Sequence, residues 1–433
     1  MDWINRYKDR IVSADEAIAL VENSQRIFLT GNVSVPSTLL AALVERAPQL
    51  KDIEICQALT VGSADYVAPE MEGHLRVNTF FISGNIRKAI HEGRADFTPV
   101  LLSEFPLLFK HKVLPVDIAL VQVSPPDEHG FCSFGVEVGP SKSPAESARI
   151  IIAEVNDKMP RTLGDSFIHV SRINYLVPVN YELPELPMSD SKPNGTIQKI
   201  AEYCAELIPD EATIQMGIGA IPDAVLKFMF DKKDLGIHTE LFSDGVIDLV
   251  EAGVLTNAKK TIHQGKIISG FVLGTKRLYD WVNDNPLIEL HPTEYVNDPF
   301  VIAKNSKMVA INSAIEIDLT GQVCADSIGS RLYSGVGGQL DFIYGASRSK
   351  GGVPIIALPS TAKDGELTRI TPMLRPGAGV VTTRSHVRYI ITEYGVADLY
   401  GKSIRKRAEA LINIAHPDFR DTLRNQAKEL NYL

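Results

Sequence analysis

Short apolar runs alternate with amphipathic stretches along most of this chain. Four of the runs are typical of buried strands: VDIALVQV (116–123), KMVAINSAIEI (307–317), GVPIIALP (352–359) and YIITEYG (389–395). Between such runs, apolar residues recur at helical spacing, as in TIQKIAEYCAEL (196–207). Strands that are apolar on both faces and alternate with helices indicate parallel sheets covered by helices on both sides. The pattern therefore predicts an α/β protein.

The two halves of the chain share one strand–loop–helix pattern. RIFLTGNVSVPSTLLAALV (26–44) and ATIQMGIGAIPDAVLKFMF (212–230) both predict a strand, a glycine loop, a proline and an amphipathic helix, 186 positions apart. At the same offset, Glu54 falls opposite Glu240 in the next strand of each half. Repetition at a fixed offset indicates a duplicated unit. We therefore expect two similar, open, mainly parallel α/β domains.

A proline-rich segment separates the two copies. VNYELPELPMSDSKPNG (179–195) contains three prolines, which remove backbone donors and disfavour helix. We interpret it as the connection between an N-terminal domain over residues 1–185 and a C-terminal domain over residues 186–433.

Charge and composition exclude several classes of function. The formal net charge of −9 leaves no overall basic field for nucleic acid. The four cysteines form no CxxC pair and show no metal-ligand spacing with the histidines, so we expect reduced, buried thiols and no metal site. The N-terminus, MDWINRYKDR, has no apolar signal segment, and the longest uncharged run (27–44) contains glycine, asparagine and proline. These features predict a soluble, cytoplasmic protein.

Two glycine-rich segments are candidates for binding a ligand through the backbone. QMGIGAIPDAV (215–225) predicts a strand that ends in glycines just before a helix, where free N–H groups approach a ligand. It is not the dinucleotide motif, because Pro222 occupies the place of the third glycine. SGVGGQLDF (334–342) offers N–H groups suited to an oxyanion. A structural turn explains either segment equally well.

One glutamate stands out in an apolar strand. Glu240 in HTELFSDGVIDL (238–249) is either a salt-bridged residue at the end of a strand or a functional carboxylate. Open α/β sheets bind ligands at the carboxyl ends of their strands, which favours function. Asp127, Glu128 and His129 resemble an acid/base cluster, but turn chemistry around two prolines explains them as easily. No G-x-S-x-G segment supports a serine nucleophile.

Seven segments, in this order, resemble the acetyl-CoA hydrolase/CoA-transferase family. They are GRADFTPVLLSEFP (93–106), SPPDEHGFCSFGVEV (124–138), IQMGIGAIPDAV (214–225), HTELFSDGVIDL (238–249), INSAIEIDLTGQV (311–323), GVGGQLDF (335–342) and LPSTAKDGELTRI (358–370). The resemblance covers nearly the whole chain. It implies the duplicated CoA-transferase fold, with the active site between two similar domains.

The resemblance also implies a mechanism centred on Glu240. Its carboxylate would attack an acyl-CoA thioester to give an acyl-glutamyl anhydride, and CoA would then form a glutamyl-CoA thioester. An incoming acid would reverse these steps, in a ping-pong cycle. The chemistry suits a carboxylate, because a group with an ordinary pKa near 4.3 is ionised at pH 7 and needs no base.

The remaining site residues are assigned by motif. For support of the oxyanion we expect Gln215, Gly337 and Gly338. For contacts with CoA we expect Gly217, Ile218, Gly219, Ala220, Ile221, Asn312, Ser313, Gly335 and Lys363. Lys363 is either a cation for the CoA phosphates or a solvated loop lysine. No cofactor is expected beyond CoA itself as a substrate.

We therefore expect a CoA-transferase that moves CoA from acetyl-CoA to a short acid, with 4-hydroxybutyrate first. A butyryl-CoA:acetate CoA-transferase and an acetyl-CoA hydrolase are the nearest alternatives, since both would use the same glutamate. A sugar-phosphate isomerase and a non-catalytic acyl-CoA-binding protein are more distant ones. The expected partners are acyl-CoA and short carboxylic acids, without nucleic acid or membrane, in a homodimer or a higher homo-oligomer.

Overall fold

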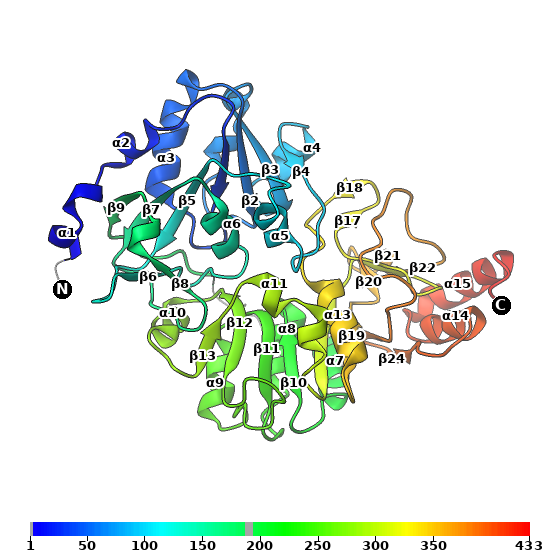
Figure 1. Cartoon of the computed structure of the whole chain (residues 1–433). Helices are drawn as coiled ribbons and strands as arrows, with labels where there is room; N and C mark the ends of the chain where they lie inside the picture. The colour runs from blue at the N-terminus through cyan, green and yellow to red at the C-terminus, as the bar shows by residue number, and fades with distance from the viewer. Residues whose placement is uncertain (1–2, 187–193) are drawn as a thin grey trace. The chain divides into compact units, whose positions relative to one another are not determined.

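The protein is described by a computed structural model, in which residues 3–186 and 194–433 are placed (Figure 1). Internal contacts divide the chain into two compact units. Unit 1 comprises residues 1–187 and 268–296, and unit 2 comprises residues 188–267 and 297–433. The predicted division into residues 1–185 and 186–433 stays a prediction. The sequence did not indicate that residues 268–296 group with the N-terminal unit.

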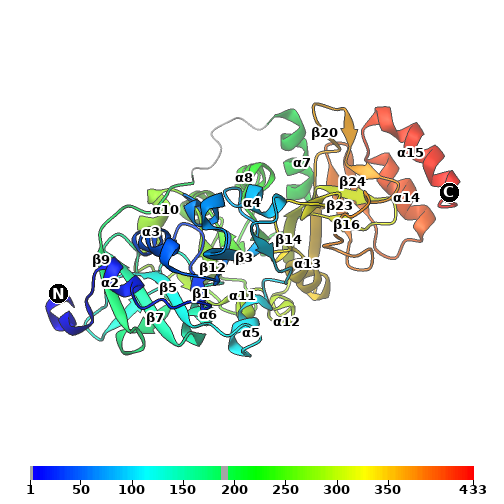
Figure 2. The ribbon, with the colours of Figure 1, turned by 90° about the horizontal axis from the view of Figure 1, so that it is seen from above.

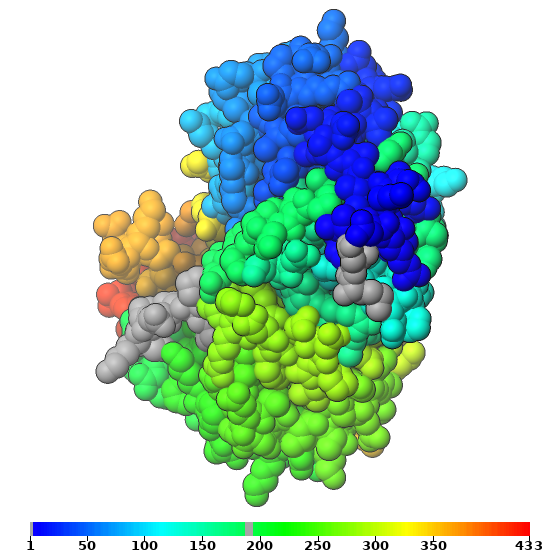
Figure 3. Space-filling view, turned by 90° about the vertical axis from the view of Figure 1, so that its left-hand side faces the viewer, coloured from blue at the N-terminus to red at the C-terminus, as the bar shows by residue number. Residues whose placement is uncertain are grey.

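Unit 1 is built on a seven-stranded parallel sheet of order β4-β3-β2-β1-β5-β7-β9. Its strands are β1 (Arg26–Leu29), β2 (Ile53–Ala58), β3 (Leu75–Phe81), β4 (Asp96–Phe97), β5 (Ile118–Val123), β7 (Ile150–Asn156) and β9 (Tyr175–Val179), with β6 (Phe131–Ser133) and β8 (Phe167–His169) in a separate hairpin-like pair. Its helices are α1 (Trp3–Arg6), α2 (Ala14–Ile18), α3 (Ser37–Arg46), α4 (Arg87–His91), α5 (Phe105–Lys110) and α6 (Lys142–Ser147). Every residue of β5 is buried, as expected for a central parallel strand. By contrast α1 has no buried residue, and it lies on the surface in dark blue in Figure 3.

The inserted segment 268–296 belongs to unit 1 because its backbone is hydrogen-bonded there. The N–H group of Gly139 donates to Gly270, and the N–H group of Val272 donates to Val136. The segment carries most of β12 (Ile267–Val272), then α10 (Lys276–Val282), β13 (Ile288–Leu290) and α11 (Thr293–Val296).

Unit 2 repeats the same architecture. Its parallel strands are β11 (Gly236–Phe242), β10 (Thr213–Met216), β14 (Met308–Ser313), β19 (Val353–Ala357) and β23 (Tyr389–Thr392), in that order, with β24 (Gly395–Asp398) antiparallel at the end. Its helices are α7 (Gly195–Glu206), α8 (Ala220–Lys227), α9 (Gly245–Glu251), α12 (Pro299–Ile302), α13 (Gln339–Arg348), α14 (Ile404–Asn413) and α15 (Pro417–Glu429). Three small sheets accompany these strands. One has three strands: β15 (Glu316–Asp318), β16 (Val323–Cys324) and β22 (Ile370–Thr371). The other two are pairs, β17 (Ser327–Ile328) with β18 (Arg331–Leu332) and β20 (Thr361–Ala362) with β21 (Leu367–Thr368). Figures 1 and 2 show α14 and α15 packed together beside β24.

The strand order confirms the predicted fold class and the repeat. The order β2-β1-β5-β7-β9 of unit 1 recurs as β11-β10-β14-β19-β23 in unit 2, and all of these neighbours are parallel. All four cysteines are buried and free, as expected. Among the residues that the structure places, no helix has the length and apolarity needed to cross a membrane.

The register corrects one detail of the repeat. Ile27 pairs with Ile55, 28 positions later, whereas Thr213, its counterpart, pairs with Gly236, only 23 positions later. The crossover between the first two strands is therefore shorter in the second copy. Consequently Leu59, and not Glu54, is the structural counterpart of Glu240, and the predicted match was wrong.

Candidate active site

Glu240 lies near the carboxyl end of β11 in an almost fully buried strand. Every other residue of β11 is buried, while Glu240 is only partly so. The next residues turn into α9 through Ser243 and Asp244, which are both buried. The glutamate side chain is thus held by a rigid strand at the edge where open α/β sheets bind ligands.

Two neutral donors from elsewhere in unit 2 converge on this carboxylate. The Asn297 side chain donates from Nδ2 to Oε2 of Glu240 at 2.9 Å. The backbone N–H group of Gly338 also donates to the Glu240 carboxylate. Asn297 is fully buried, and Gly338 is the residue at which α13 begins. Together they form a pair of preorganised donors of the kind that stabilises an oxyanion.

The surroundings of Glu240 raise its pKa from an ordinary 4.5 to about 7. Burial is the main cause, because an ionised carboxylate loses its hydration there. The hydrogen bonds from Asn297 and Gly338 act in the opposite direction, since they favour the ionised form. The ordinary pKa predicts full ionisation at pH 7, whereas the raised pKa favours the protonated form of Glu240 more than the sequence suggests.

The close packing around Glu240 explains why the GVGG motif has glycine at positions 337 and 338. A Cβ atom on Gly338 would overlap both Oε2 of Glu240 and Nδ2 of Asn297. Gly337 has φ +60°, a left-handed backbone conformation that favours glycine. These two glycines therefore let the α13 terminus approach the carboxylate closely, while their predicted supporting role stays a prediction.

The predicted CoA loop is open on its outer side. Gly217 follows β10 and Gly219 precedes α8, and a Cβ atom on either glycine would meet nothing within 4 Å. Ile218, Gly219 and Ala220 are exposed. Ile221 is buried instead, because it lies on the apolar side of α8. Within the described part of the chain, no side chain caps α8 at Gly219.

In unit 1, a side chain of the protein accepts a hydrogen bond from the first turn of the equivalent helix, α3. Glu154 on β7 is fully buried and accepts the N–H group of Leu39, in the first turn of α3, at 2.6 Å. In the second copy, Ile356 takes the place of Glu154, because Gln122 pairs with Glu154 as Asn312 pairs with Ile356. An apolar residue leaves the start of α8 without that internal carboxylate. The contrast favours unit 2 as the ligand-binding copy.

Three predicted residues gather at the ends of β10 and β14. Asn312 donates from Nδ2 to Oε1 of Gln215 at 3.0 Å, so that the buried Gln215 supports the end of β14. The next residue, Ser313, is exposed. Its carbonyl oxygen accepts a hydrogen bond from Nε2 of Gln339 at 2.6 Å. Gln339 directly follows Gly338, and this bond connects the start of α13 to the end of β14.

Sequence reasoning missed Asn297 and Gln339. Asn297 stands in TEYVNDPF, between α11 and α12, where nothing in the pattern distinguishes it from a turn residue. Gln339 directly follows the GVGG motif, from which the sequence predicts a role for backbone N–H groups alone. The polar side chain next to this motif is the one sequence feature that could have indicated Gln339.

Two other predicted features lie apart from this cluster. Oδ1 of Asp127 accepts the N–H groups of both His129 and Phe131 at 2.9 Å, so this segment is a turn that leads into β6. The His129 side chain is 75% exposed, which argues against an acid/base role. Lys363 is exposed at the turn between β20 and β21, beside a separate cavity.

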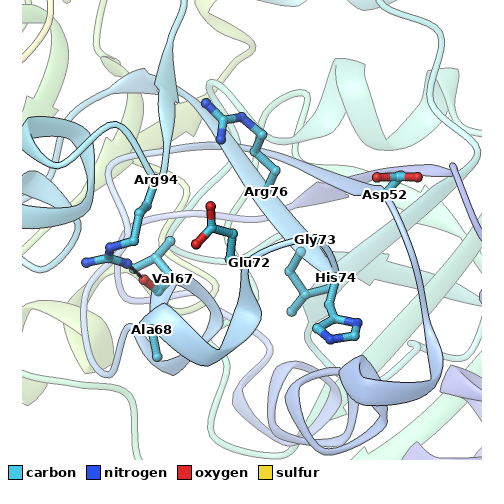
Figure 4. A pocket seen from close by; sticks show the side chains of 9 residues that line it. Asp52, Val67, Ala68, Glu72, Gly73, His74, Arg76 and Arg94 are labelled. Atoms are coloured by element: carbon cyan, nitrogen blue, oxygen red, sulfur yellow. Dashed lines mark hydrogen bonds between the residues drawn. The ribbon is translucent and has the colours of Figure 1, made fainter.

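A cavity of about 330 Å³ in unit 1 has charged walls but lies at the opposite edge of a sheet (Figure 4). Asp52 and His74 precede β2 and β3, so this is the amino end of those strands. The side chain of Arg94 donates to the Val67 carbonyl and to Glu92, and Arg76 is paired with Asp96. Because both arginines are already hydrogen-bonded within the protein, and ligands of α/β proteins bind at the carboxyl edge of the sheet, this cavity is not a candidate active site.

The sequence comparisons show the family of the chain. The sequence model of the acetyl-CoA hydrolase/transferase N-terminal domain matches residues 1–184, and that of the acetyl-CoA hydrolase/transferase C-terminal domain matches residues 274–427. The chain belongs to the acetyl-CoA hydrolase/transferase family. The predicted family and the predicted class of enzyme, a CoA-transferase, are thereby confirmed.

Three relatives of this family member cover nearly its whole length. It is 53% identical over 430 residues to the 4-hydroxybutyrate coenzyme A transferase of Clostridium kluyveri, covering 99% of this chain and 100% of that protein. It is 48% identical to the succinyl-CoA:acetate/propanoyl-CoA:succinate CoA transferase of Fasciola hepatica, over 96% of this chain and 87% of that one. Among solved structures, a 4-hydroxybutyrate CoA-transferase of Porphyromonas gingivalis matches with a TM-score of 0.84 and 40% identity, over 99% of this chain and 100% of the other.

Proposed function

We propose that this CoA-transferase moves CoA from acetyl-CoA to a short carboxylic acid, with Glu240 as the covalent carrier. One observation carries the proposal: a carboxyl group with a pKa of about 7 lies between Nδ2 of Asn297 and the N–H group of Gly338. Neutral donors also stabilise a buried structural carboxyl group, as at Glu154, which accepts from Leu39 and Tyr181. Glu240 differs because it is only partly buried and lies at the sheet edge where ligands bind, so its donors can also stabilise an oxyanion formed on its own carbonyl group.

The first half-reaction starts at the ionised carboxylate. An oxygen of Glu240 attacks the thioester carbonyl carbon, the C–S bond breaks, and the products are an acyl-glutamyl anhydride and CoA thiolate. The thiolate then attacks the glutamyl carbonyl carbon. The anhydride C–O bond breaks, the first acid leaves as its carboxylate, and CoA remains on Glu240 as a thioester. No net proton transfer is required.

The position of the two donors suggests which steps they serve. Both donate to the carboxyl group of Glu240 itself, so they stabilise the negative charge that develops when the glutamyl carbonyl is attacked. These are the attack by the CoA thiolate and, in the second half-reaction, the attack by the incoming acid. The donors also favour ionised Glu240 at the start, opposing the effect of burial.

For the acid we propose 4-hydroxybutyrate, with butyrate second. The relative at 53% identity bears the name of that acid, which supports this choice. The relative at 48% identity is named for succinyl-CoA, acetate and propanoyl-CoA, so succinate is the main rival. One hydroxyl group discriminates strongly only where a buried polar group must pair with it. We also propose that the enzyme needs no cofactor beyond CoA, and that it forms a homodimer or a higher homo-oligomer.

Two experiments test the proposal. The enzyme is incubated with acetyl-CoA alone and treated with borohydride, which reduces a glutamyl thioester to an alcohol. The peptide containing Glu240 should lose about 14 Da, as expected for a covalent intermediate at that residue. A label on another residue would overturn the mechanism.

The second experiment is a transfer assay with acetyl-CoA and a panel of acids. We expect the highest kcat/KM for 4-hydroxybutyrate. Succinate or propionate ahead of both C4 monoacids by tenfold would overturn the choice of acid. Release of free CoA without any acid acceptor, at the rate of transfer, would favour an acetyl-CoA hydrolase instead.

A further inference from the structure

The backbone that carries the Gly338 donor is not held in place by its own residues. Gly337 and Gly338 lack the Cβ atom that would collide with Glu240, but this also gives the peptide between them wide conformational freedom. The Gly338 N–H group precedes the first turn of α13, so it takes no part in the hydrogen bonds of the helix. Contacts outside this peptide must therefore fix the direction in which the N–H group points.

The next residue, Gln339, is held at both ends of its side-chain amide. Its Nε2 atom donates to the carbonyl oxygen of Ser313 at 2.6 Å, and its Oε1 atom accepts the hydroxyl group of Thr382 at 3.1 Å. A carbonyl oxygen can only accept, so the Ser313 contact determines the orientation of the amide. Gln339 and Thr382 are both buried, where hydrogen bonds are costly to leave unmade. The first residue of α13 is thereby fixed from two directions.

Both partners of Gln339 belong to hydrogen-bonded strand segments. Ser313 ends β14, which pairs with β10 on one side and β19 on the other. Thr382 pairs with Val323 of β16: the Val323 N–H group donates to the Thr382 carbonyl at 3.0 Å, and the Thr382 N–H group donates back at 3.3 Å. β16 in turn pairs with β15 in a separate small sheet. The Gln339 amide thus connects two sheets across the start of α13.

The fold itself does not require this connection, as unit 1 shows. There α6 lies between β5 and β7 in the chain, as α13 lies between β14 and β19. The first residue of α6 is Lys142, and its Nζ atom donates to the carbonyl oxygen and the carboxylate of Asp165, which precedes β8. Unit 1 also has Leu59 at the place of Glu240. The amide connection therefore occurs in the copy that contains the carboxylate.

We propose that Gln339 and Thr382 are positioning residues for the transfer reaction. Thr382 orients the Gln339 amide, Gln339 fixes the start of α13, and the Gly338 N–H group is thereby kept directed at the Glu240 carboxyl group. Both residues act through this N–H group and not through contact with the substrate. The inference rests on the proposed function, because an oxyanion formed on Glu240 is the charge that the N–H group stabilises.

The test compares Gln339→Met, Thr382→Val and Thr382→Ser in the transfer assay. Methionine keeps the length of the side chain without the amide, valine keeps the shape of threonine without the hydroxyl group, and serine keeps the hydroxyl group. We expect kcat to fall about 10- to 10²-fold in Gln339→Met, and less in Thr382→Val, with little change in KM for acetyl-CoA. Thr382→Ser should recover most of the lost kcat. Since the Gly338 hydrogen bond favours ionised Glu240, the rising limb of the pH–rate profile should move to higher pH in the two impaired variants.

Thr392→Val is the matched control. Thr392 is also fully buried, and its hydroxyl group donates to the Ile414 carbonyl at 2.6 Å. It lies on β23, four strand spacings or about 19 Å from β11. We expect the midpoint of thermal unfolding to fall in Thr392→Val as in Thr382→Val, because each loses a buried hydrogen bond, but kcat and the pH–rate profile should stay at their wild-type values. The same pattern in Thr382→Val, a loss of stability alone, would overturn the positioning role, and this holds even where Gln339→Met fails to fold.

Titration of Glu240 without substrate separates this proposal from the proposed function. The protein is labelled with ¹³C at the glutamate carboxyl groups, and the Glu240 signal is identified by its absence from the spectrum of Glu240→Gln. The pKa of Glu240 should be higher in Gln339→Met and Thr382→Val than in the wild-type protein, and unchanged in Thr392→Val. An unchanged pKa in all variants would overturn the positioning role. A raised pKa, combined with no borohydride label on Glu240 in the wild-type protein, would overturn the proposed function and leave the positioning of the N–H group standing.

Discussion

The Nδ2 atom of Asn297 lies 2.9 Å from Oε2 of Glu240, although 57 residues separate them in the chain. The contact joins a loop between two short helices to the carboxyl end of a buried strand. Together with the N–H group of Gly338, Asn297 provides two hydrogen-bond donors to the Glu240 carboxylate. This arrangement leads to four predictions.

Removing the Glu240 carboxyl group should abolish transfer. Glu240→Ala and Glu240→Gln lack the nucleophile, so we expect no exchange of label between acetyl-CoA and acetate above background. Glu240→Asp should lose about 10²-fold in kcat, because its shorter side chain misplaces the attacking oxygen by about 1 Å. Glu54→Gln is the control: Glu54 also lies on the second strand of its copy, but it is paired with Arg26 at 2.7 Å. Ping-pong transfer by Glu240→Gln would rule out the covalent mechanism.

Asn297 should act on the rate rather than on substrate binding. Asn297→Ala removes one oxyanion donor, so kcat should fall about 10²- to 10³-fold while KM changes little. Asn297→Asp is more informative, because a second carboxylate beside Glu240 raises the pKa of that group further. The rising limb of its pH–rate profile should move to higher pH. A profile that keeps its wild-type position would contradict a direct contact between the two side chains in solution.

The two glycine segments should respond differently to added side chains. Gly338→Ala should cost most of the activity, because the new methyl group overlaps Glu240 and Asn297. At the CoA loop, Gly217 is a cleaner probe than Gly219, whose φ of +122° strains any replacement. Gly217→Val projects into open space, so it should raise KM for acetyl-CoA and leave the midpoint of thermal unfolding near the wild-type value. Unchanged KM in Gly217→Val would remove this loop from the CoA site.

The raised pKa of Glu240 should link activity and stability to pH in opposite directions. The folded-state pKa of about 7 lies above the ordinary 4.5, so the folded protein holds the proton more tightly than the unfolded chain does. The resulting stabilisation is complete below about pH 4.5 and is lost as pH rises to about 7, by roughly 3 kcal/mol. The first half-reaction should accelerate over the upper part of this range, because only the ionised form attacks.

Denaturant unfolding of the wild-type protein and of Glu240→Gln, measured across this pH range, checks the linkage. The free energy of unfolding of the variant should decline less between pH 5 and pH 8. Glu154, whose pKa burial also raises to about 7, contributes to both proteins and cancels in the difference. Parallel curves for the two proteins would show that Glu240 titrates normally.

The sequence alone determined the class of fold and the duplication, and it pointed to Glu240 as the candidate nucleophile. Buried parallel strands and amphipathic helices leave a local periodicity, and a repeated glycine–proline spacing survives in both copies. Glu240 could be singled out because it interrupts an apolar strand and lies in a segment that resembles a known family. The glycines at 337 and 338 were found in the same way. Each of these signals lies within a short stretch of chain.

Only the tertiary structure decided which groups meet. Glu54 and Glu240 share a sequence offset but not a structural place, because the crossover that precedes each strand differs in length and shifts the register. Asn297 and Gln339 carry no local signature, since their contacts arise from strands and helix ends that packing brings together. Glu154 likewise closes the α3 terminus from a distant strand, whereas Ile356 leaves α8 open. Local side-chain patterns specify elements, while convergence at one sheet edge depends on pairing register and crossover length.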